Sequence, residues 1–389
     1  MRIVVFGFDG FCAWPMSLQL ACAGHEVIGV DNYSRRLIDS ELGSSSLTPI
    51  SSPAVRQAAA RDAGANIPQV IKLDVTDYYS VYNLLRRFEP EAIFHTAEIR
   101  SAPYSMISDH HKNVTISNNI AGTHNILNAI VALKMQDLTH LVHIGTMGVY
   151  GYGGTRAMLP EGYADITIHG QDAEGNPVDD RRQTLYPTNP GSIYHMTKSM
   201  EQIMFAFYAK NNGLRITDLH QGIIWGSQTD LTLSNECVIN RLDYDQTYGT
   251  VLNRFLIQAA LEVPLTVYGT GGQTRAFIHI RDSVRCVQWA IEDYNYDGRV
   301  RIINQVTEFE SVANLARAVV ISTGATIKNY ENPRKELAEN TLVASNAYFK
   351  AKGLLNPVRL ADNLLLEYPL IQKHRDRADL ALVPPSTKW

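Results

Sequence analysis

The sequence predicts an α/β fold in which a doubly wound parallel sheet fills the first half of the chain. Two observations lead to this fold class. Short apolar runs alternate with helical patterns through the first half, and a glycine turn separates the first run from the first helix. Regular alternation of strands and helices is typical of a parallel sheet with helices on both faces.

The elements follow from this alternation in chain order. The apolar runs that we predict as strands are residues 2–6, 26–30, 70–73, 92–96 and 140–144, and residues 215–225 add a sixth strand. The segments that we predict as helices are residues 13–23, 78–88, 113–134 and 192–211.

Two long segments interrupt the pattern after the fifth and sixth strands. Residues 151–191 are rich in Gly, Pro and Asp, and residues 227–250 are polar. Open α/β sheets bind ligands at the carboxyl ends of their strands, so we expect both segments to cover a substrate. We therefore divide the chain into residues 1–226 and a smaller cap of residues 227–389, interleaved with the first domain because no linker separates them.

Composition and charge exclude several classes of partner. The chain has 389 residues, is 45% hydrophobic and carries a net charge of −4. It has no basic run and no apolar stretch of about 20 residues, so we expect neither a nucleic-acid nor a membrane partner. The first residues already form a strand and a turn, which leaves no room for a targeting segment. We expect a cytoplasmic location with four reduced cysteines, which are Cys12, Cys22, Cys237 and Cys286.

The first turn has the pattern of a dinucleotide site. Gly7, Gly10 and Ala13 allow a tight turn, a close approach to a pyrophosphate, and close packing of helix on strand. Asp31 ends the second strand, where a carboxylate meets the adenosine ribose and disfavours the extra phosphate of NADP. The turn predicts a Rossmann domain that binds NAD. Arg35 and Arg36 follow closely and keep NADP as an alternative.

Further cofactor contacts are expected around this turn and at the ends of the next strands. These residues are Asp9, Phe11, Cys12, Asn32, Asp74, Val75 and Thr96. Gly145, Gly148 and Gly151 repeat the glycine spacing after another strand. No helix follows them, so we do not interpret them as a second nucleotide site.

Tyr194 and Lys198 form the candidate catalytic pair. Four residues make about one helical turn, so both side chains lie on one face, and a nearby cation favours the phenolate. We expect Tyr194 to take a hydroxyl proton and Lys198 to hold the nicotinamide ribose, while Thr146 orients the alcohol. Tyr348 and Lys352 have the same spacing, and we interpret that pair as a solvated helix face.

His195 lies next to Tyr194 but points about 100° away around the helix. A packing role and a direct catalytic role are both open for it. None of the twelve histidines has metal-site spacing with a second histidine or cysteine, so we expect no metal.

Taken together, these motifs resemble the extended short-chain dehydrogenase/reductase superfamily, which includes NAD-dependent nucleotide-sugar epimerases and dehydratases, and within it the UDP-sulfoquinovose synthase family. The segments that carry the resemblance are DNYSRRL, LTPI, RSAPYSM, GTMG, YHMTK, NRLDYD, GTVLNRF, PLTVYGTGGQTR, HIRD, NQVTE and NPR. The resemblance implies a nucleotide-diphospho-sugar substrate and a homodimer formed through the helices that include 113–134 and 192–211. It also implies substrate contacts by Arg100, Met147, Gln221, Asn253, Arg275 and Arg334.

Two positions depart from that family's pattern, which has glutamate at 149 and glutamine at 99. This chain has Val149 and Ile99. We interpret both as apolar changes near the sugar. Two interpretations fit them: the site uses Glu98, His195 or Tyr194 for a different step after oxidation, or the pocket is shaped for a sugar with a bulkier or less polar group beyond carbon 5. The favoured function is a nucleotide-sugar epimerase that transiently oxidises carbon 4, in bacterial specialised-sugar biosynthesis. The alternative is a UDP-sulfoquinovose synthase or a 4,6-dehydratase acting on UDP-glucose. Intact Thr146, Tyr194 and Lys198 oppose a third reading, a regulator without catalytic activity.

Overall fold

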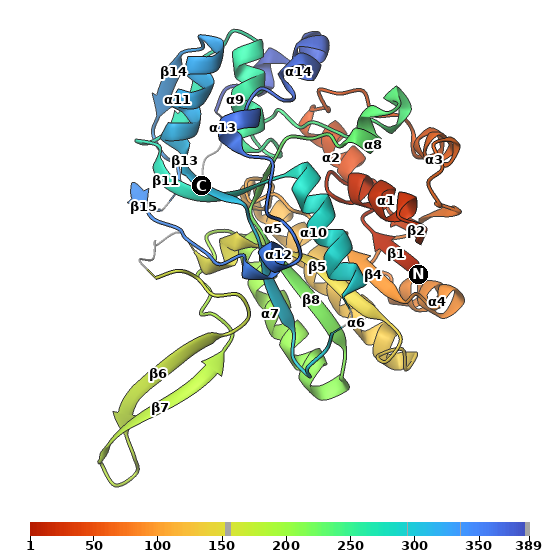
Figure 1. Cartoon of the computed structure of the whole chain (residues 1–389), viewed down its shortest axis with the longest axis vertical. Helices are drawn as coiled ribbons and strands as arrows, with labels where there is room; N and C mark the ends of the chain where they lie inside the picture. Colours follow the sequence, from red (N-terminus) through yellow and green to blue (C-terminus); the bar gives the residue numbers. More distant parts are fainter. Residues whose placement is uncertain (152–156, 294, 335, 386–389) are drawn as a thin grey trace.

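A seven-stranded parallel sheet forms the centre of the molecule (Figure 1). We describe it from a computed structural model that covers residues 1–151, 157–293, 295–334 and 336–385. The strands occur in the order β3-β2-β1-β4-β5-β8-β12. Their bounds are Arg2–Phe6 (β1), Glu26–Asp31 (β2), Gln69–Lys72 (β3), Ala92–His95 (β4), His140–Thr146 (β5), Arg215–Gln221 (β8) and Arg301–Gln305 (β12).

Strand β1 shows why the sheet is covered on both faces. Its side chains alternate in direction, and Ile3 and Val5 belong to one hydrophobic core while Val4 and Phe6 belong to the other. All four are fully buried. A strand that is apolar on both faces requires helices on both sides, as the alternating sequence predicts.

The helices complete the two outer layers. Side chains of α1 (Ala13–Cys22) and α10 (Ile280–Glu292) fill one core. Side chains of α4 (Tyr78–Phe88), α6 (Gly122–Ala132) and α7 (Ile193–Asn212) fill the other. The remaining helices of the first domain are α2 (Ser34–Leu42), α3 (Pro53–Asp62), a short 3₁₀ turn (Tyr104–Met106) and α5 (Asp109–Ile116).

Three elements differ from the prediction. The single helix expected at 113–134 is α5, a π-helical turn over 117–121, and α6. The sixth strand ends at Gln221, and β9 (Ile223–Trp225) turns away to pair with β11. Gly222 permits this change, because a Cβ atom there would lie 2.9 Å from the Ala276 carbonyl oxygen. Strand β12, from the range assigned to the cap, joins the main sheet as a seventh strand.

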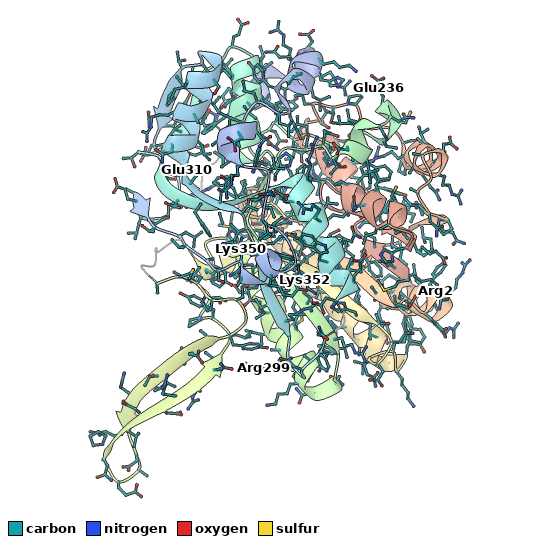
Figure 2. All side chains as sticks on the ribbon, in the orientation of Figure 1. Arg2, Glu236, Arg299, Glu310, Lys350 and Lys352 are labelled. Atoms are coloured by element: carbon teal, nitrogen blue, oxygen red, sulfur yellow. The ribbon has the colours of Figure 1, made fainter. Side chains whose placement is uncertain are left out.

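The insertion after β5 forms an antiparallel hairpin of β6 (Ala164–Gln171) and β7 (Pro177–Thr184), which we call the arm. Figure 1 shows the arm extending away from the body of the molecule. The insertion was expected to cover a substrate; its two ends, Gly151 and Asn189 to Gly191, line the cavity described below, while the strands of the arm do not. Its strand residues are mostly exposed. Arg299, near the base of the arm (Figure 2), donates to Gln183 Oε1 at 2.9 Å and stacks on Tyr163. Residues 152–156 of this insertion lie outside the described residues.

A second lobe is built mainly from the remaining residues. Strand β11 pairs with β13, β9 and β15, and β10 pairs with β14. A separate hydrophobic core around Phe255 and Phe277 holds this lobe together. Within the described ranges, no helix has both the length and the apolar character needed to cross a membrane. The bounds are Asp230–Leu233 (α8), Val251–Ala260 (α9), Leu265–Tyr268 (β10), Gly272–His279 (β11), Glu308–Ser311 (β13), Val312–Thr323 (α11), Ile327–Tyr330 (β14), Glu339–Asn340 (β15), Ala347–Ala351 (α12), Leu360–Asn363 (α13) and Tyr368–His374 (α14).

Candidate active site

A cavity of about 1200 Å³ opens where the carboxyl ends of the central strands meet the second lobe. Thr96 after β4, Thr146 at the end of β5 and Gln221 at the end of β8 all contribute to its wall. The volume exceeds what one small ligand usually occupies, which suits a cofactor and a substrate together. The predicted site residues that line it are Gly10, Phe11, Cys12, Arg35, Thr96, Glu98, Arg100, Thr146, Met147, Tyr194, His195, Lys198, Gln221, Arg275 and Arg334.

The glycine turn has the geometry that a dinucleotide requires. Gly7 has φ +84°, and a Cβ atom there would lie 2.6 Å from the backbone carbon of Thr96. A Cβ atom at Gly10 would lie 2.9 Å from the Gly7 carbonyl oxygen. Only glycine leaves this loop open to the backbone approach of a pyrophosphate, and α1 begins directly after it. The residues present therefore fit NAD.

Asp31 is fixed at the end of β2 by the backbone. Its carboxylate accepts hydrogen bonds from the Asp9 N–H at 2.8 Å and from the Tyr33 N–H at 2.6 Å. Burial raises the pKa of Asp31 to about 6, above its ordinary value of 3.8. The carboxylate is thus held in one orientation beside the glycine turn, and its charge depends on pH near neutrality.

Arg35 and Arg36, the two arginines that kept NADP as an alternative, each form ion pairs with carboxylates of the protein. Arg36 Nε donates to Asp9 Oδ2 at 2.6 Å, and Arg35 forms ion pairs with Asp39 and Asp243. Each guanidinium is therefore neutralised by a carboxylate of the protein, and an added 2′-phosphate would have to compete for it. This arrangement favours NAD over NADP.

Eight predicted contact residues lie outside the cavity lining. Gly7, Asp9, Asp31 and Arg36 belong to the glycine turn and the groups around it, and the side chains of the other four serve the fold. Asn32 donates to Asp74 Oδ2 at 2.9 Å, and Asp74 also accepts from the Thr76 N–H. Val75 packs against the backbone of α6 at Gly122. The side-chain amide of Asn253 binds the N–H and the carbonyl of Gly226, so Asn253 does not face a substrate as predicted.

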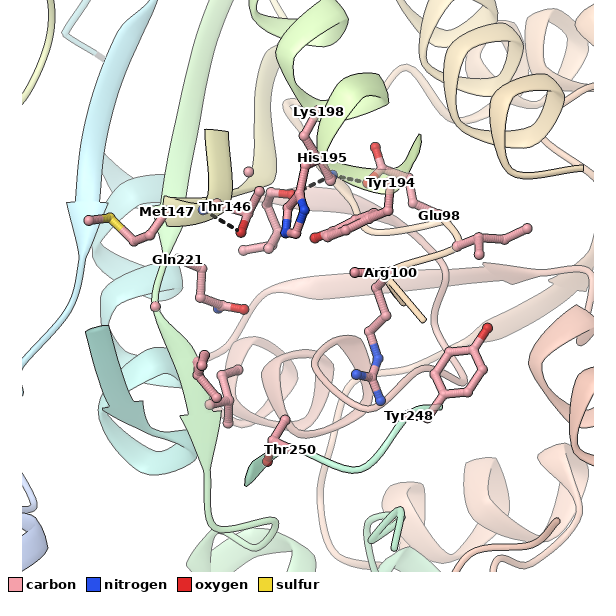
Figure 3. Close-up of a pocket in the computed structure, with 18 of the residues that line it drawn as sticks. Glu98, Arg100, Thr146, Met147, Tyr194, His195, Lys198, Gln221, Tyr248 and Thr250 are labelled. Atoms are coloured by element: carbon pink, nitrogen blue, oxygen red, sulfur yellow. Dashed lines mark hydrogen bonds and ion pairs between the residues drawn. The ribbon is translucent and has the colours of Figure 1, made fainter. Parts of the chain in front are cut away.

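Helix α7 presents Tyr194 to the cavity. Its first turn is capped by Ser192, whose Oγ accepts from the His195 N–H at 3.2 Å, and the Tyr194 N–H donates to Ser105 Oγ. Thr146 Oγ1 accepts from the Gly148 N–H at 3.1 Å, which fixes its hydroxyl at the end of β5. Figure 3 shows the Thr146, Tyr194 and His195 side chains directed into the same space.

Lys198 is buried, and its ammonium contacts several acceptors. It forms an ion pair with Glu98 and donates to the Ile144 carbonyl at 2.6 Å. Burial lowers the pKa of Lys198, while the Glu201 and Asp218 carboxylates oppose that effect. Glu98, whose side chain is 4% exposed, is therefore the counter-ion of Lys198. This pairing argues against Glu98 as an independent base for the substrate.

His195 lines the cavity as an uncharged imidazole. Its Nδ1 lies 2.9 Å from Ser192 Oγ, and the residue is 6% exposed. Burial, together with the positive charges of Arg334 and Arg275, lowers the pKa of His195 to about 3. At neutral pH the ring is therefore uncharged, and it can donate or accept a hydrogen bond with a ligand.

Three arginines bring positive charge to the cavity wall. Arg275 forms an ion pair with Glu336, and Arg334 lies close enough to His195 to influence its pKa. Arg100 donates to Asp243 Oδ2 at 2.8 Å. A phosphate that binds Arg275 or Arg100 in the two-pronged manner that arginine favours would have to compete with Glu336 or Asp243, as it would at Arg35 and Arg36.

Several lining residues have no signal that sequence reasoning recognised. Arg241, Tyr248 and Thr250 come from the polar segment 227–250, where only the segment as a whole was expected to cover the substrate. Ile38 and Leu342 also line the cavity, from α2 and from the loop after β15. Residues like these are brought together by tertiary contacts between distant segments.

Val149 does not occupy the position that the sequence suggested. It is 1% exposed, and the described lining passes from Gly148 to Gly151 without it. Its carbonyl accepts from the Asn189 N–H in the short 3₁₀ turn Met147–Tyr150. Ile99 does line the cavity, so only one of the two apolar departures changes the wall.

One group of side chains has the spacing of metal ligands. Single ligand atoms of Glu98, His143 and Glu201 lie within 4.8 Å of one another. The Lys198 ammonium contacts Glu98 and lies 3.4 Å from Glu201 Oε2, so a cation of the protein already neutralises the group. The expectation of no metal stays a prediction.

Comparison with known proteins agrees with this geometry. The sequence profile of the NAD dependent epimerase/dehydratase family matches residues 3–306. The UDP-sulfoquinovose synthase of the chloroplast of Spinacia oleracea is 39% identical, over 100% of this chain and 79% of that protein. The UDP-sulfoquinovose synthase of Sulfolobus acidocaldarius is 35% identical, over 100% of this chain and 98% of that protein.

Solved structures show the same fold at lower identity. A UDP-glucuronic acid 4-epimerase from Bacillus cereus, in complex with UDP-glucuronic acid and NAD, has a TM-score of 0.66 and 22% identity over 96% of this chain and 99% of that one. A UDP-glucose 4-epimerase from Stenotrophomonas maltophila with bound NAD has a TM-score of 0.71 and 19% identity, over 97% of this chain and 100% of that one. The chain therefore belongs to the NAD-dependent epimerase/dehydratase family, and its cofactor is NAD.

Proposed function

We propose that this protein is a UDP-sulfoquinovose synthase, which makes a sulfonated nucleotide sugar from UDP-glucose and sulfite. The observation that carries the proposal is the identity of 39% and 35% to two such synthases over the whole chain. Epimerases that share the fold are 19% to 22% identical. This proposal replaces the epimerase that the sequence favoured, because the relatives that match over the whole chain are synthases.

Oxidation at carbon 4 of the glucose is the first step. Tyr194 accepts the proton of the 4-hydroxyl group, and Thr146 holds that hydroxyl through its own Oγ1. NAD, when bound, accepts the hydride from carbon 4 and later returns it. The Lys198 ammonium stabilises negative charge on the Tyr194 oxygen during the proton transfer.

The resulting ketone acidifies the hydrogen at carbon 5, which prepares loss of water across carbons 5 and 6. Among the predicted catalytic residues, His195 suits contact with this part of the sugar, because it is neutral and lines the cavity. Glu98 is less suited, because its carboxylate is bound to Lys198 and His143. Sulfite then adds to carbon 6, and reduction of the ketone completes the reaction.

Positive charge in the cavity suits an anionic substrate pair. Arg275 and Arg334 are proposed to hold the diphosphate, and Arg100 lies on another part of the wall. Gln221, whose amide donates to Gln305 Oε1 and Ser283 Oγ, is held in place in the cavity wall at the end of β8. Met147 adds an apolar surface next to Thr146 (Figure 3).

Ile99 supports a second candidate function. It places an apolar side chain in the cavity wall where the family pattern has glutamine. A less polar wall would disfavour sulfite while leaving oxidation intact, and the enzyme would then release an epimerised nucleotide sugar.

The two candidates give different products. The purified protein is incubated with UDP-glucose and sulfite, and the products are separated and weighed by mass spectrometry. A product with the added mass of the sulfonate supports the synthase. An isomer of UDP-glucose that forms at the same rate with and without sulfite would overturn the synthase in favour of the epimerase.

We also propose that two copies associate through helices α6 and α7. Helix α7 exposes Met200, Ile203 and Phe207 along one side, with Ile203 65% and Phe207 57% exposed. Large apolar side chains clustered on an exposed helix are typical of a contact surface between proteins.

A further inference from the structure

A chain of buried ionisable side chains runs from Lys198 into the interior of the first domain. His143 Nε2 lies 2.9 Å from both Lys198 Nζ and Glu98 Oε1. On its other side, His143 Nδ1 lies 2.8 Å from Asp218 Oδ1. His220 Nε2 follows, 3.1 Å from Asp218 Oδ2. We call His143, Asp218 and His220 the buried relay.

The relay ends at a residue outside the cavity lining. His220 Nδ1 lies 2.7 Å from the Tyr150 hydroxyl, which in turn donates to Asn304 Oδ1 at 3.1 Å. The Tyr150 ring packs edge-to-face on Tyr186, just beyond the arm. Hydrogen bonds and ion pairs thus connect Lys198 to Tyr150, and a ring contact connects Tyr150 to Tyr186 next to the arm.

The strand register explains how these residues meet. His143 on β5 and Asp218 on β8 are direct cross-strand partners, and Gly145 is the partner of His220. A Cβ atom at Gly145 would lie 2.5 Å from Asp218 Oδ1 and 3.0 Å from the His220 ring. Gly145 therefore leaves the space that both side chains occupy. We do not interpret the glycines at 145, 148 and 151 as a nucleotide site. Gly145 instead makes room for the side chains of the buried relay.

The relay is buried together with the charges that face it. Asp218, His143 and His220 are each at most 1% exposed. The groups that face His143 are Lys198 and Glu201 from α7, Glu98 after β4, His95 from β4 and Asp218 from β8. Those that face Lys198 are Glu98, Glu201 and His143, with Asp218 and Cys12 acting over a longer distance.

The electrostatics of the relay favour the charged forms of His143 and Asp218. Hydrogen bonds and charge from Asp218 and Glu201 outweigh burial and raise the pKa of His143 to about 9. The neighbouring His220 and His143 hold the pKa of Asp218 well below its ordinary value. Buried charges of this kind are costly unless each has a partner, and both nitrogens of His143 and both oxygens of Asp218 have one.

We infer that His143, Asp218 and His220 are positioning residues for Lys198: the Asp218 carboxylate, held between the two histidines, favours the ammonium form of Lys198, and the contact with His143 fixes the place of Lys198 beside Tyr194. Lys198 is surrounded by protein, and burial alone favours its neutral form. The negative charge of Asp218, fixed between two histidines, opposes that tendency. The inference rests on the proposed oxidation, because it assigns to Lys198 the support of proton transfer at Tyr194.

The first test measures the protonation of His143 without substrate or turnover. The full-length protein is prepared with ¹⁵N-labelled histidine, and the signal of His143 is identified by its loss in His143→Gln. The ring should carry two protons at neutral pH and titrate near pH 9. In Asp218→Asn the midpoint should fall by at least about one pH unit, because the partner charge is gone.

The second test measures how turnover depends on pH. Activity should fall on the alkaline side as Lys198 loses its proton. Asp218→Asn should move this alkaline limb about one pH unit toward lower pH, because Lys198 loses a stabilising negative charge. His220→Gln, one residue further from Lys198, should move the limb in the same direction by less. If these residues only supported the fold, the substitutions would lower the maximal activity and leave the pH of the alkaline limb unchanged.

His140→Gln is the matched control. His140 lies on β5 as His143 does, and its Nε2 is 2.8 Å from Thr217 Oγ1 on β8, at the opposite end of the two strands from the cavity. Its substitution should move neither the His143 titration nor the alkaline limb. An unchanged His143 midpoint in a folded Asp218→Asn variant would overturn the inference. If UDP-glucose is not a substrate, the proposed function fails, and the NMR titration still decides for or against the relay.

Discussion

The ring of His195 occupies space that is open only because residue 148 is glycine. A Cβ atom at Gly148 would lie 2.5 Å from His195 Nε2, closer than nonbonded atoms approach. The GTMG segment at the end of β5 thus supplies Thr146 for the substrate and room for the imidazole beside it. This relationship links a glycine outside any nucleotide motif to the candidate catalytic geometry.

Substituting Gly148→Ala should therefore displace His195 from the cavity. We expect at least a tenfold loss of kcat, with the NAD content of the purified protein unchanged, because the glycine turn at Gly7 is distant from this contact. Steady-state kinetics and the absorbance of extracted cofactor measure both. Gly170→Ala, in the arm with open space around it, is the control and should keep normal kinetics. Normal turnover by Gly148→Ala would show that the His195 position is not needed.

Tyr194→Phe should remove the proton acceptor while leaving the ring in place. We expect turnover to fall by a factor of about 10² to 10⁴, the usual contribution of a positioned acid or base. Cofactor binding should persist. The matched control is Tyr348→Phe, because Tyr348 and Lys352 both contact Asp293, away from the cavity. Equal activity in both variants would contradict the role of Tyr194.

The affinity for NAD should depend on the charge of Asp31. Because burial raises its pKa to about 6, the carboxylate is protonated below that pH and cannot accept two ribose hydroxyls. We expect affinity to be greatest above pH 6 and to weaken as the pH falls below it. Fluorescence titration of the cofactor-free protein measures this. In Asp31→Asn the affinity should be about tenfold lower and constant across the same range. A pH dependence that survives this substitution would assign the titration to another group.

The proposed pairing of two copies should depend on the apolar side of α7. Phe207→Glu places a charge on a side chain that is 57% exposed and should convert a dimer into monomers. Light scattering after gel filtration gives the mass directly. Ile321→Glu on α11, at another exposed apolar side chain, should leave the mass unchanged. If the unsubstituted protein is a monomer, or if the dimer persists in Phe207→Glu, the proposed contact through α7 is wrong.

Local patterns in the sequence predicted much of the fold and of the cofactor site. The glycine turn and the apolar run at residues 3–6 of β1 are patterns that a few consecutive residues display, even though β1 pairs with β4, which lies about 90 positions away in the sequence. Strand β12 was not predicted because its sequence, RIINQ, mixes polar and apolar residues. It becomes a strand by pairing with β8, which only tertiary structure can show.

The residues of the candidate site also divide into those that a local sequence pattern predicts and those that only the tertiary structure brings together. Tyr194 and Lys198 were found because one helical turn sets their spacing. The contact of His143 with Asp218 joins residues 75 positions apart, and no periodicity connects them. Asn253 was assigned to the substrate by resemblance, but its amide closes a backbone contact at Gly226. A residue type that suits a ligand also suits a buried backbone group, and sequence alone does not separate the two.

The most direct test of the account follows the hydrogen on carbon 4. UDP-glucose with deuterium at that carbon is mixed with the enzyme and sulfite, the reaction is stopped during turnover, and the bound cofactor is weighed by mass spectrometry. We expect reduced cofactor that carries the deuterium, and a sulfonated product in which deuterium has returned to carbon 4. Product formation with no deuterium in the cofactor at any time would contradict oxidation at carbon 4.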